Sequence, residues 1–188
     1  MQETILVTGA GGYIGSITTK LLLEHGFSVI ALDNFKKGYK EPLLKLQQIY
    51  GVENLVIVEA DITSNDLHTV FTINPFIKAV MHFAALLNVG ESSKMPERYF
   101  TNNVWGTQNI LEQTIKHNIE YFIFSGSCTV YGNAQYTPID ENHPIQKPES
   151  VYGQSKRMCE ELLEWYSKLN RIKYVTLRYF NVCGATPD

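Results

Sequence analysis

Tyr152 and Lys156 are the two residues with the clearest chemical potential, and they stand four positions apart in the stretch Tyr-Gly-Gln-Ser-Lys. On a helix this spacing puts both side chains on one face. A phenol has a pKa of about 10, so a tyrosine that accepts a proton near neutral pH needs about 4 kcal/mol of anion stabilisation. One ammonium at about 6 Å supplies about 3 kcal/mol at an effective dielectric constant of about 20. The pair therefore predicts a proton-abstracting tyrosine that needs a second cation nearby.

A glycine-rich turn close to the N-terminus indicates where that second cation would come from. Gly9, Gly12 and Gly15 lie between an apolar run and a segment with helical periodicity. In such a turn the first glycine permits the sharp bend, the second lets backbone N–H groups approach a pyrophosphate, and the third lets helix and strand pack closely. The helix N-terminus adds partial positive charge beneath the phosphates. The pattern predicts a dinucleotide site, whose oxidised nicotinamide would be the cation beside Tyr152.

Asp33 indicates which dinucleotide is bound. It follows Gly15 by 18 residues and ends the second apolar run. A carboxylate at this point accepts hydrogen bonds from both ribose hydroxyls of adenosine, and it repels a 2′-phosphate. Asp33 therefore favours NAD over NADP as the cofactor. The competing interpretation is an aspartate that caps a turn.

Two further clusters follow apolar runs. Asp61 and Ile62 come after the third run and are predicted to cover the adenine, although a helix N-cap explains Asp61 equally well. Phe83, Ala84 and Ala85 follow the fourth run, where small residues would let the cofactor lie against the backbone. Close packing between elements is the alternative role for these three residues.

The elements that must position these residues alternate along the chain. Strands are predicted over 5–7, 27–32, 55–58, 79–83, 121–124 and 174–177, and helices over 14–22, 43–50, 66–73, 96–117 and 150–169. Strands that are almost continuously apolar are buried on both faces, which indicates a parallel sheet covered by helices. Repeated strand–helix–strand units give a doubly wound α/β fold, which binds ligands beyond the carboxyl ends of its strands. The predicted fold is a Rossmann-type NAD-binding domain over residues 1–188.

Composition fits that fold and narrows the possible partners. The chain has 188 residues, 44% hydrophobic and 19% charged, which is typical of one globular domain. A net charge of −3 gives no electrostatic reason to expect nucleic acid or an anionic membrane as a partner. Three widely spaced cysteines predict neither disulfides nor a metal site. The first residues predict neither a signal peptide nor a membrane span, so we expect a cytoplasmic protein.

The segment 126–148 is predicted to be mostly loop. Its 23 residues are rich in Asn, Gln, Pro and acidic groups. A loop of this length inside a compact domain is usually functional. We therefore expect this segment to be functional.

A set of short motifs extends from the first predicted strand to the last residues. They are VTGAGGYIGS (7–16), LDN (32–34), HFAA (82–85), VGES (89–92), NNVWGT (102–107), TVYG (129–132), YGQSK (152–156) and RYFNVCGA (178–185). In sequence and order they resemble the extended short-chain dehydrogenases, and most closely the UDP-glucose 4-epimerase branch of that family.

The resemblance implies an activity and assigns roles. It implies interconversion of UDP-glucose and UDP-galactose at C4 through a transient 4-keto sugar, with NAD as cofactor. In this scheme Ser127 hydrogen-bonds the sugar O4, Tyr152 removes its proton, and Lys156 binds the nicotinamide ribose and lowers the pKa of Tyr152. Asn181 would contact the sugar nucleotide. The remaining cofactor contacts that it implies are Tyr13, Ile14, Asp33, Asn34, Asp61, Ile62, Asn102, Ser125 and Phe180.

The chain departs from the family pattern at two points. Relatives often carry a lysine near the cofactor phosphates where this chain has Leu87, so that contact is not carried over. The smaller C-terminal domain that grips the uridine diphosphate in relatives is also missing. We therefore expect residues 1–188 to be the cofactor half of a longer enzyme, although a naturally short protein is the alternative.

The sequence bears on related activities and on assembly as well. Cys128 and Thr129 stand where dehydratase relatives carry Asp and Glu, so elimination of water lacks its proton donors. Epimerisation of a UDP-N-acetylhexosamine or a UDP-uronate is the nearest rival, and a non-catalytic dinucleotide-binding protein is the rival of another class. Relatives dimerise through helices equivalent to 96–117 and 150–169, which predicts a homodimer. Burial of those helices under the missing domain is the competing interpretation.

Overall fold

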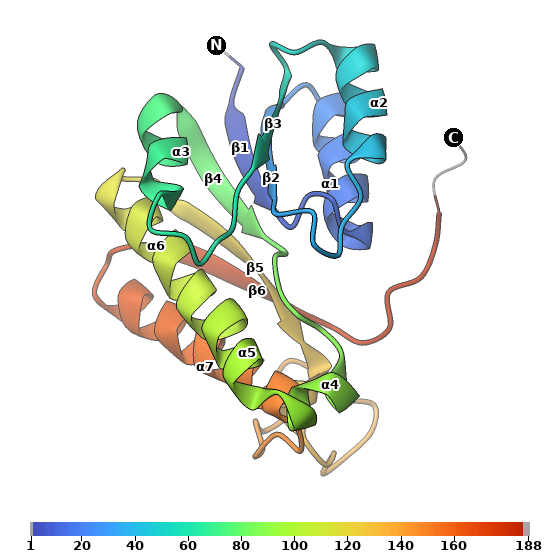
Figure 1. Ribbon diagram of the computed structural model, residues 1–188. Helices are drawn as coiled ribbons and strands as arrows, with labels where there is room; N and C mark the ends of the chain where they lie inside the picture. The colour runs from blue at the N-terminus through green and yellow to red at the C-terminus, as the bar shows by residue number, and fades with distance from the viewer. Residues whose placement is uncertain (1, 186–188) are drawn as a thin grey trace.

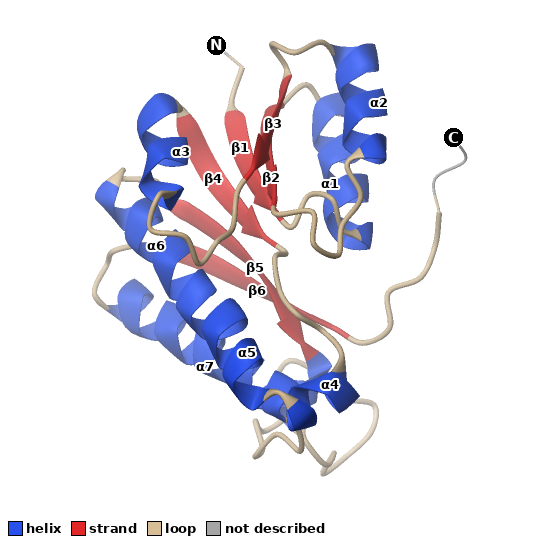
Figure 2. Ribbon diagram, in the orientation of Figure 1, coloured by secondary structure: helices blue, strands red, loops and turns tan. Residues whose placement is uncertain are grey.

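The computed structural model describes residues 2–185 and has one six-stranded parallel sheet, in the order β3-β2-β1-β4-β5-β6 (Figures 1 and 2). The strands are β1 (Thr4–Thr8), β2 (Ser28–Asp33), β3 (Leu55–Glu59), β4 (Ile77–His82), β5 (Tyr121–Ser127) and β6 (Lys173–Tyr179). This order reverses direction after β1, so a crevice opens between the carboxyl ends of β1 and β4. The predicted doubly wound fold is confirmed.

Helices cover both faces of the sheet (Figure 2). On one face lie α1 (Tyr13–Glu24) and α2 (Glu41–Tyr50), and on the other lie α3 (Leu67–Ile73), α6 (Gly106–Lys116) and α7 (Val151–Lys168). The two faces form separate apolar clusters, and strand β1 contributes alternately to both. Ile5 and Val7 pack with the α1 and α2 side, whereas Leu6 packs with the α3, α6 and α7 side. This two-sided burial explains why the strand sequences are almost continuously apolar.

Strand β6 is an exception to the predicted two-sided burial. Tyr174 packs against the cluster on the α7 side, but Val175 is 54% exposed and Leu177 is 37% exposed. The reason is that α1 and α2 lie over the other half of the sheet, and no helix between residues 2 and 185 covers this face of β6 (Figure 2).

The single long helix predicted over 96–117 is wrong in detail. The segment consists of α5 (Pro96–Tyr99), a π-helical turn (Phe100–Trp105) and α6, preceded by a short helix α4 (Val89–Lys94) that we did not predict. The wider turn changes which side chains face inward. Asn102 lines the cavity described below, while the buried amide of Asn103 bonds the backbone of Leu86 and the hydroxyl of Ser155. The π-helical turn thus gives two adjacent asparagines different environments.

The segment 126–148 contains more regular structure than predicted. Strand β5 continues through Ser127, and a 3₁₀ turn follows at Cys128–Tyr131. The irregular remainder is held by His143, which is buried, accepts a hydrogen bond from the Gln135 N–H at Nε2 and packs against Tyr131.

Of the helices in the described part of the chain, none is long and apolar enough to cross a membrane. Residues 186–188, where we expected the chain to lead into another domain, lie outside the described residues.

Candidate active site

One cavity of about 1060 Å³ lies at the carboxyl ends of the strands. All of the residues that the sequence analysis assigned to cofactor, catalysis or substrate line it. They are Gly9, Gly12, Tyr13, Ile14, Gly15, Asp33, Asn34, Asp61, Ile62, Phe83, Ala84, Ala85, Asn102, Ser125, Ser127, Tyr152, Lys156, Phe180 and Asn181. Its volume is at the upper end of the range for small-molecule sites, which suits a ligand as long as a dinucleotide. The fold therefore brings the predicted cofactor and catalytic residues to one place.

The glycine turn between β1 and α1 is shaped for close backbone approach. Gly9 has a φ of +70°, and a Cβ added there would lie 2.6 Å from the backbone nitrogen of Ala84. A Cβ added at Gly15 would lie 2.1 Å from the carbonyl oxygen of Gly9. Within the described residues no side chain caps the N-terminus of α1 at Gly12. Its first N–H groups thus face the cavity as anion donors, so the turn fits a pyrophosphate.

Asp33 caps the turn after β2 and also lines the cavity, where its binding of the adenosine ribose stays a prediction. Its Oδ2 accepts a hydrogen bond from the Gly11 N–H at 2.9 Å, and its Oδ1 accepts one from the Phe35 N–H at 2.8 Å. The carboxylate therefore fixes the loop after β2 against the glycine turn. A carboxylate has about four acceptor positions, so about two remain for ribose hydroxyls.

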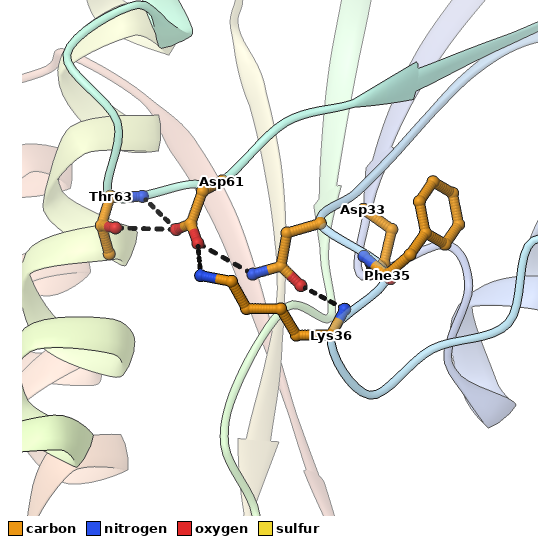
Figure 3. Close-up of polar contacts among 6 residues, drawn as sticks. Asp33, Phe35, Lys36, Asp61 and Thr63 are labelled. Carbon is orange, nitrogen blue, oxygen red and sulfur yellow. Dashed lines mark hydrogen bonds and ion pairs between the residues drawn. The ribbon is translucent and has the colours of Figure 1, made fainter.

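Asp61 does not cap a helix, since Asp66 occupies the N-cap position of α3. Its carboxylate instead accepts hydrogen bonds from the backbone and hydroxyl of Thr63, from the Asn34 amide and from the Lys36 ammonium (Figure 3). Burial raises the pKa of Asp61, but these hydrogen bonds together outweigh it and hold the pKa well below its ordinary value. Asp61 is therefore an anion that joins the loops after β2 and β3.

Tyr152 lies in the first turn of α7, and two serines fix the backbone of that turn. Ser150 is the N-cap, and its hydroxyl accepts a hydrogen bond from the Gly153 N–H. The hydroxyl of Ser92, on α4, accepts a hydrogen bond from the Tyr152 N–H at 3.1 Å. The phenol faces the cavity together with Ser127, which ends β5.

The charges of the protein around Tyr152 do not lower its pKa enough for it to act as a base near neutral pH. Burial raises the pKa of Tyr152, and the neighbouring Ser127 hydroxyl offsets part of this rise. Lys156 is 3% exposed, donates to the Ser125 carbonyl at 2.7 Å and lies 4.8 Å from the centre of the Phe124 ring. Burial lowers the pKa of Lys156 to about 8, partly offset by Cys159 and Glu160. The protein alone therefore supplies a positioned phenol, and a further positive charge in the cavity is needed to ionise it near neutral pH.

A buried polar chain runs behind the cavity from β1 to α6. His82 ends β4, and its ring bonds the hydroxyl of Thr8 at 2.6 Å and that of Thr107 at 2.9 Å. The ring lies 5.9 Å from that of Phe124, stacked against it. Burial, with the nearby charge of Lys156, lowers the pKa of His82 to about 3. The histidine is therefore neutral at physiological pH and has a structural role at the end of β4.

We predict that His82 makes the fold sensitive to acid. The unfolded chain takes up a proton at this side chain below about pH 6.5, whereas the folded chain does so only near pH 3. The free energy of unfolding should therefore fall as the pH drops through this window, by about 2 kcal/mol between pH 6.5 and about pH 5. Urea unfolding at both pH values measures the difference. His82→Asn should remove most of it, whereas His68→Asn, at an exposed position on α3, should leave it unchanged.

The chain beyond β6 runs back toward the side of the sheet that α1 covers (Figure 1). Phe180 and Asn181 line the cavity, and the Tyr13 hydroxyl donates a hydrogen bond to the carbonyl of Gly184. Phe180 is 60% exposed. This segment therefore forms an open wall of the cavity.

Sequence reasoning missed several residues of this site. Ser92 and Asn103 belong to motifs that we quoted, but their contacts depend on how α4 and the π-helical turn pack. Lys36, Lys37 and Tyr39 line the cavity and follow Asp33 in the loop, so their position after the predicted ribose residue was the available signal. Between residues 2 and 185, no three His, Cys, Asp or Glu side chains gather to hold a metal ion.

Comparison with known proteins agrees with this geometry. UDP-glucose 4-epimerase of Halalkalibacterium halodurans is 40% identical over 185 residues, which are 98% of this chain and 52% of that protein. The crystal structure of UDP-glucose 4-epimerase from Bifidobacterium longum in complex with NAD⁺ and UDP has a TM-score of 0.88 and 36% identity, and covers 95% of this chain and 53% of that one. The UDP-Glc/GlcNAc 4-epimerase of Campylobacter jejuni has a TM-score of 0.90 and 35% identity, over 99% of this chain and 56% of that one.

The chain thus spans about half the length of the relatives that it matches. Residues 5–188 match the model of a family described as "NAD dependent epimerase/dehydratase family". The resemblance found in the sequence motifs is confirmed, and the chain belongs to the NAD-dependent epimerase/dehydratase family.

Proposed function

We propose that the protein is an NAD-dependent epimerase of nucleotide sugars that interconverts UDP-glucose and UDP-galactose at C4. The observation that carries this proposal is the convergence of Ser127, Tyr152 and Lys156 on the cavity that also contains the glycine turn and Asp33. A site that only binds a dinucleotide has no use for a buried serine, a buried lysine and a half-buried tyrosine at its reactive end. Their presence therefore favours a catalyst over a non-catalytic binding protein.

We propose that the cofactor lies along the whole length of the cavity. The glycine turn and the N-terminus of α1 would hold the pyrophosphate, and Asp33 would hold the adenosine ribose. When bound, NAD⁺ supplies the acceptor and later the donor of the hydride at C4, together with a positive charge at the nicotinamide. The other proposed cofactor contacts are Tyr13, Ile14, Asn34, Asp61, Ile62, Phe83, Ala84, Ala85, Asn102, Ser125, Tyr152, Lys156 and Phe180.

The chain's own residues move the proton. Ser127 hydrogen-bonds the sugar O4 and orients it toward Tyr152, whose phenolate accepts the O4 proton as C4 is oxidised. Lys156 keeps a positive charge beneath the site and holds its end of α7 to β5 through the Ser125 carbonyl. After the 4-keto sugar has turned over in the site, Tyr152 returns the proton to O4. Asn181 would contact the sugar nucleotide.

The sugar of the substrate has more than one candidate. The relative from Campylobacter jejuni is named for both UDP-glucose and UDP-N-acetylglucosamine, so an N-acetylated substrate is the second candidate. A UDP-uronate is a third possibility within the same chemistry. Because relatives are about twice as long as this chain, we propose that a further C-terminal region encloses the sugar nucleotide.

We also propose a homodimer formed through the helices at 96–117 and 150–169. On α7, Cys159 and Leu163 face the core, whereas Trp165 and Leu169 are 66% and 64% exposed. An exposed apolar stripe of this kind is typical of a covered surface. Burial under a further domain remains the competing interpretation.

The three cysteines are free thiols, which agrees with the cytoplasmic location that we propose.

Incubation of the full-length protein with UDP-galactose and NAD, followed by chromatography of the products, tests the proposed activity. We expect UDP-glucose to accumulate until the two sugars reach equilibrium. UDP-N-acetylgalactosamine is the parallel substrate, and faster conversion of it would move the assignment to the second candidate. Binding of NAD without conversion of any UDP-sugar would favour the non-catalytic alternative.

We predict that NAD⁺ lowers the pKa of Tyr152. Without cofactor, burial keeps this pKa above its ordinary value. The positive nicotinamide ring beside the phenol favours the phenolate, so the pKa must fall when NAD⁺ binds. The absorbance of phenolate, taken as the difference between the wild type and Tyr152→Phe over a pH titration, measures it. NADH is the matched control because its nicotinamide is uncharged, and an equal fall with NADH would contradict the charge mechanism.

A further inference from the structure

The end of the cavity that we assign to adenosine carries charged side chains besides Asp33. Asp33 is 8% exposed, and each of its carboxylate oxygens already accepts one backbone N–H. These two donors offset part of its negative charge toward the cavity. Lys36 and Lys37 follow it within the same loop and line the same cavity. Repulsion by Asp33 is therefore only one of the charge effects that a 2′-phosphate would meet.

Lys36 is drawn away from Asp33 by a second carboxylate. Its side chain extends from the loop after β2 toward Asp61, which follows β3 (Figure 3). The ammonium lies 2.9 Å from Asp61 Oδ2, which also accepts the amide of Asn34 at 2.9 Å. The lysine side chain is 71% exposed, so its position depends on this pair and not on packing.

Asp61, in contrast, is firmly placed. Its Oδ1 accepts the Thr63 N–H at 3.0 Å and the Thr63 hydroxyl at 2.7 Å. Together with the two donors at Oδ2, these bonds occupy both oxygens of the carboxylate. Asp61 is thus a fixed anion, whereas the exposed Lys36 ammonium is placed by this pair.

A lysine or arginine beside the adenosine ribose is the feature that accommodates a 2′-phosphate. We propose that Asp61 is a specificity-determining residue for the coenzyme, because it holds the Lys36 ammonium away from the ribose 2′ position and so favours NAD over its 2′-phosphorylated form. This inference rests on the proposed binding of NAD in the cavity. It assigns to Asp61 and Lys36 a discrimination that the sequence assigned to Asp33 alone.

Calorimetric titration of NAD and of NADP into the wild type and four variants tests the proposal. Asp61→Asn keeps an oxygen for Thr63 but releases Lys36, and we expect the preference for NAD over NADP to fall about tenfold, as for one charge contact in a partly exposed site. Lys36→Met should keep the wild-type preference for NAD over NADP, because it adds no cation near the ribose. The double variant Asp61→Asn, Lys36→Met should regain the wild-type preference, because the cation that would bind the phosphate is gone.

The matched control is the double variant Asp61→Asn, Lys37→Met, which removes the neighbouring cation and should keep the relaxed preference. The gain in NADP binding by Asp61→Asn should also weaken with added salt, since it depends on an exposed charge pair.

Three results would overturn the proposal. Equal weakening of both dinucleotides by Asp61→Asn would mean that Asp61 only shapes the adenine site. A relaxed preference that persists without Lys36 would mean that Asp61 acts through its own charge. A wild type that prefers NADP would remove the discrimination itself. Failure of the wild type to bind either dinucleotide would overturn the proposed function as well, whereas the first two results leave NAD binding by the wild type intact.

Discussion

Replacing Tyr152 with Phe is expected to lower the rate of epimerisation about a thousandfold while the protein keeps its affinity for NAD within about twofold. Loss of one positioned proton-transfer group costs about 10²–10⁴ in rate. The ring of Tyr152 stays in the cavity wall, and its backbone N–H still bonds Ser92 on α4. The substitution therefore removes only the group that accepts the O4 proton. Steady-state turnover of UDP-galactose by the full-length protein and calorimetric binding of NAD measure the two effects separately.

The matched control for this substitution is Tyr166→Phe on the same helix. Tyr166 packs against the core on the α7 side and lies four turns of helix from Tyr152. It should lose neither turnover nor NAD binding. Near-normal turnover in Tyr152→Phe would show that another group removes the proton. A parallel loss of NAD binding would show that the hydroxyl serves the cofactor, and the assigned role would be wrong.

Most of the fold could be predicted from the sequence, because strands and turns leave short-range patterns in the order of the residues. A strand buried on both faces must be apolar at consecutive positions, and β1 and β2 satisfy this directly. The turn of Gly9 to Gly15 is partly local too, because Gly9 has a positive φ and a Cβ at Gly15 would clash with the Gly9 carbonyl oxygen. Parallel strands end at one edge of the sheet, so residues placed after strands were bound to meet there.

The parts that could not be predicted depend on contacts between distant segments. The π-helical turn at Phe100–Trp105 has no pattern of its own, and it accompanies the close packing of Gly106 on Ile62, where an added Cβ would lie 2.5 Å from the isoleucine side chain. The exposure of Val175 on β6 depends on which strands α1 and α2 cover. The pairing of Lys36 with Asp61 joins two loops 25 residues apart. Such features follow from packing, which a single sequence does not display.

The second large effect is expected from a substitution in the glycine turn, and a comparison of two glycines that both have a positive φ isolates it. Gly9 has a φ of +70° and Gly26, at the end of α1, has a φ of +81°. An alanine at either position is strained by about 1–2 kcal/mol, because an L side chain disfavours the left-handed region. Only Gly9 meets a neighbour: its added Cβ would lie 2.6 Å from the Ala84 nitrogen, whereas nothing lies within 4 Å of a Cβ at Gly26.

We therefore expect Gly9→Ala to lower the free energy of unfolding by about 3–4 kcal/mol, and Gly26→Ala by about 1–2 kcal/mol. Urea unfolding of the two variants gives this difference. The clash at Gly9 is with backbone, which cannot turn aside as a side chain does, so β1 and β4 must separate at their carboxyl ends. That separation displaces both the pyrophosphate turn and the Phe83–Ala85 wall of the cavity. Affinity for NAD should therefore fall more than a hundredfold in Gly9→Ala and stay within about twofold in Gly26→Ala. Equal losses of affinity in both variants would mean that stability, and not the shape of the turn, governs cofactor binding.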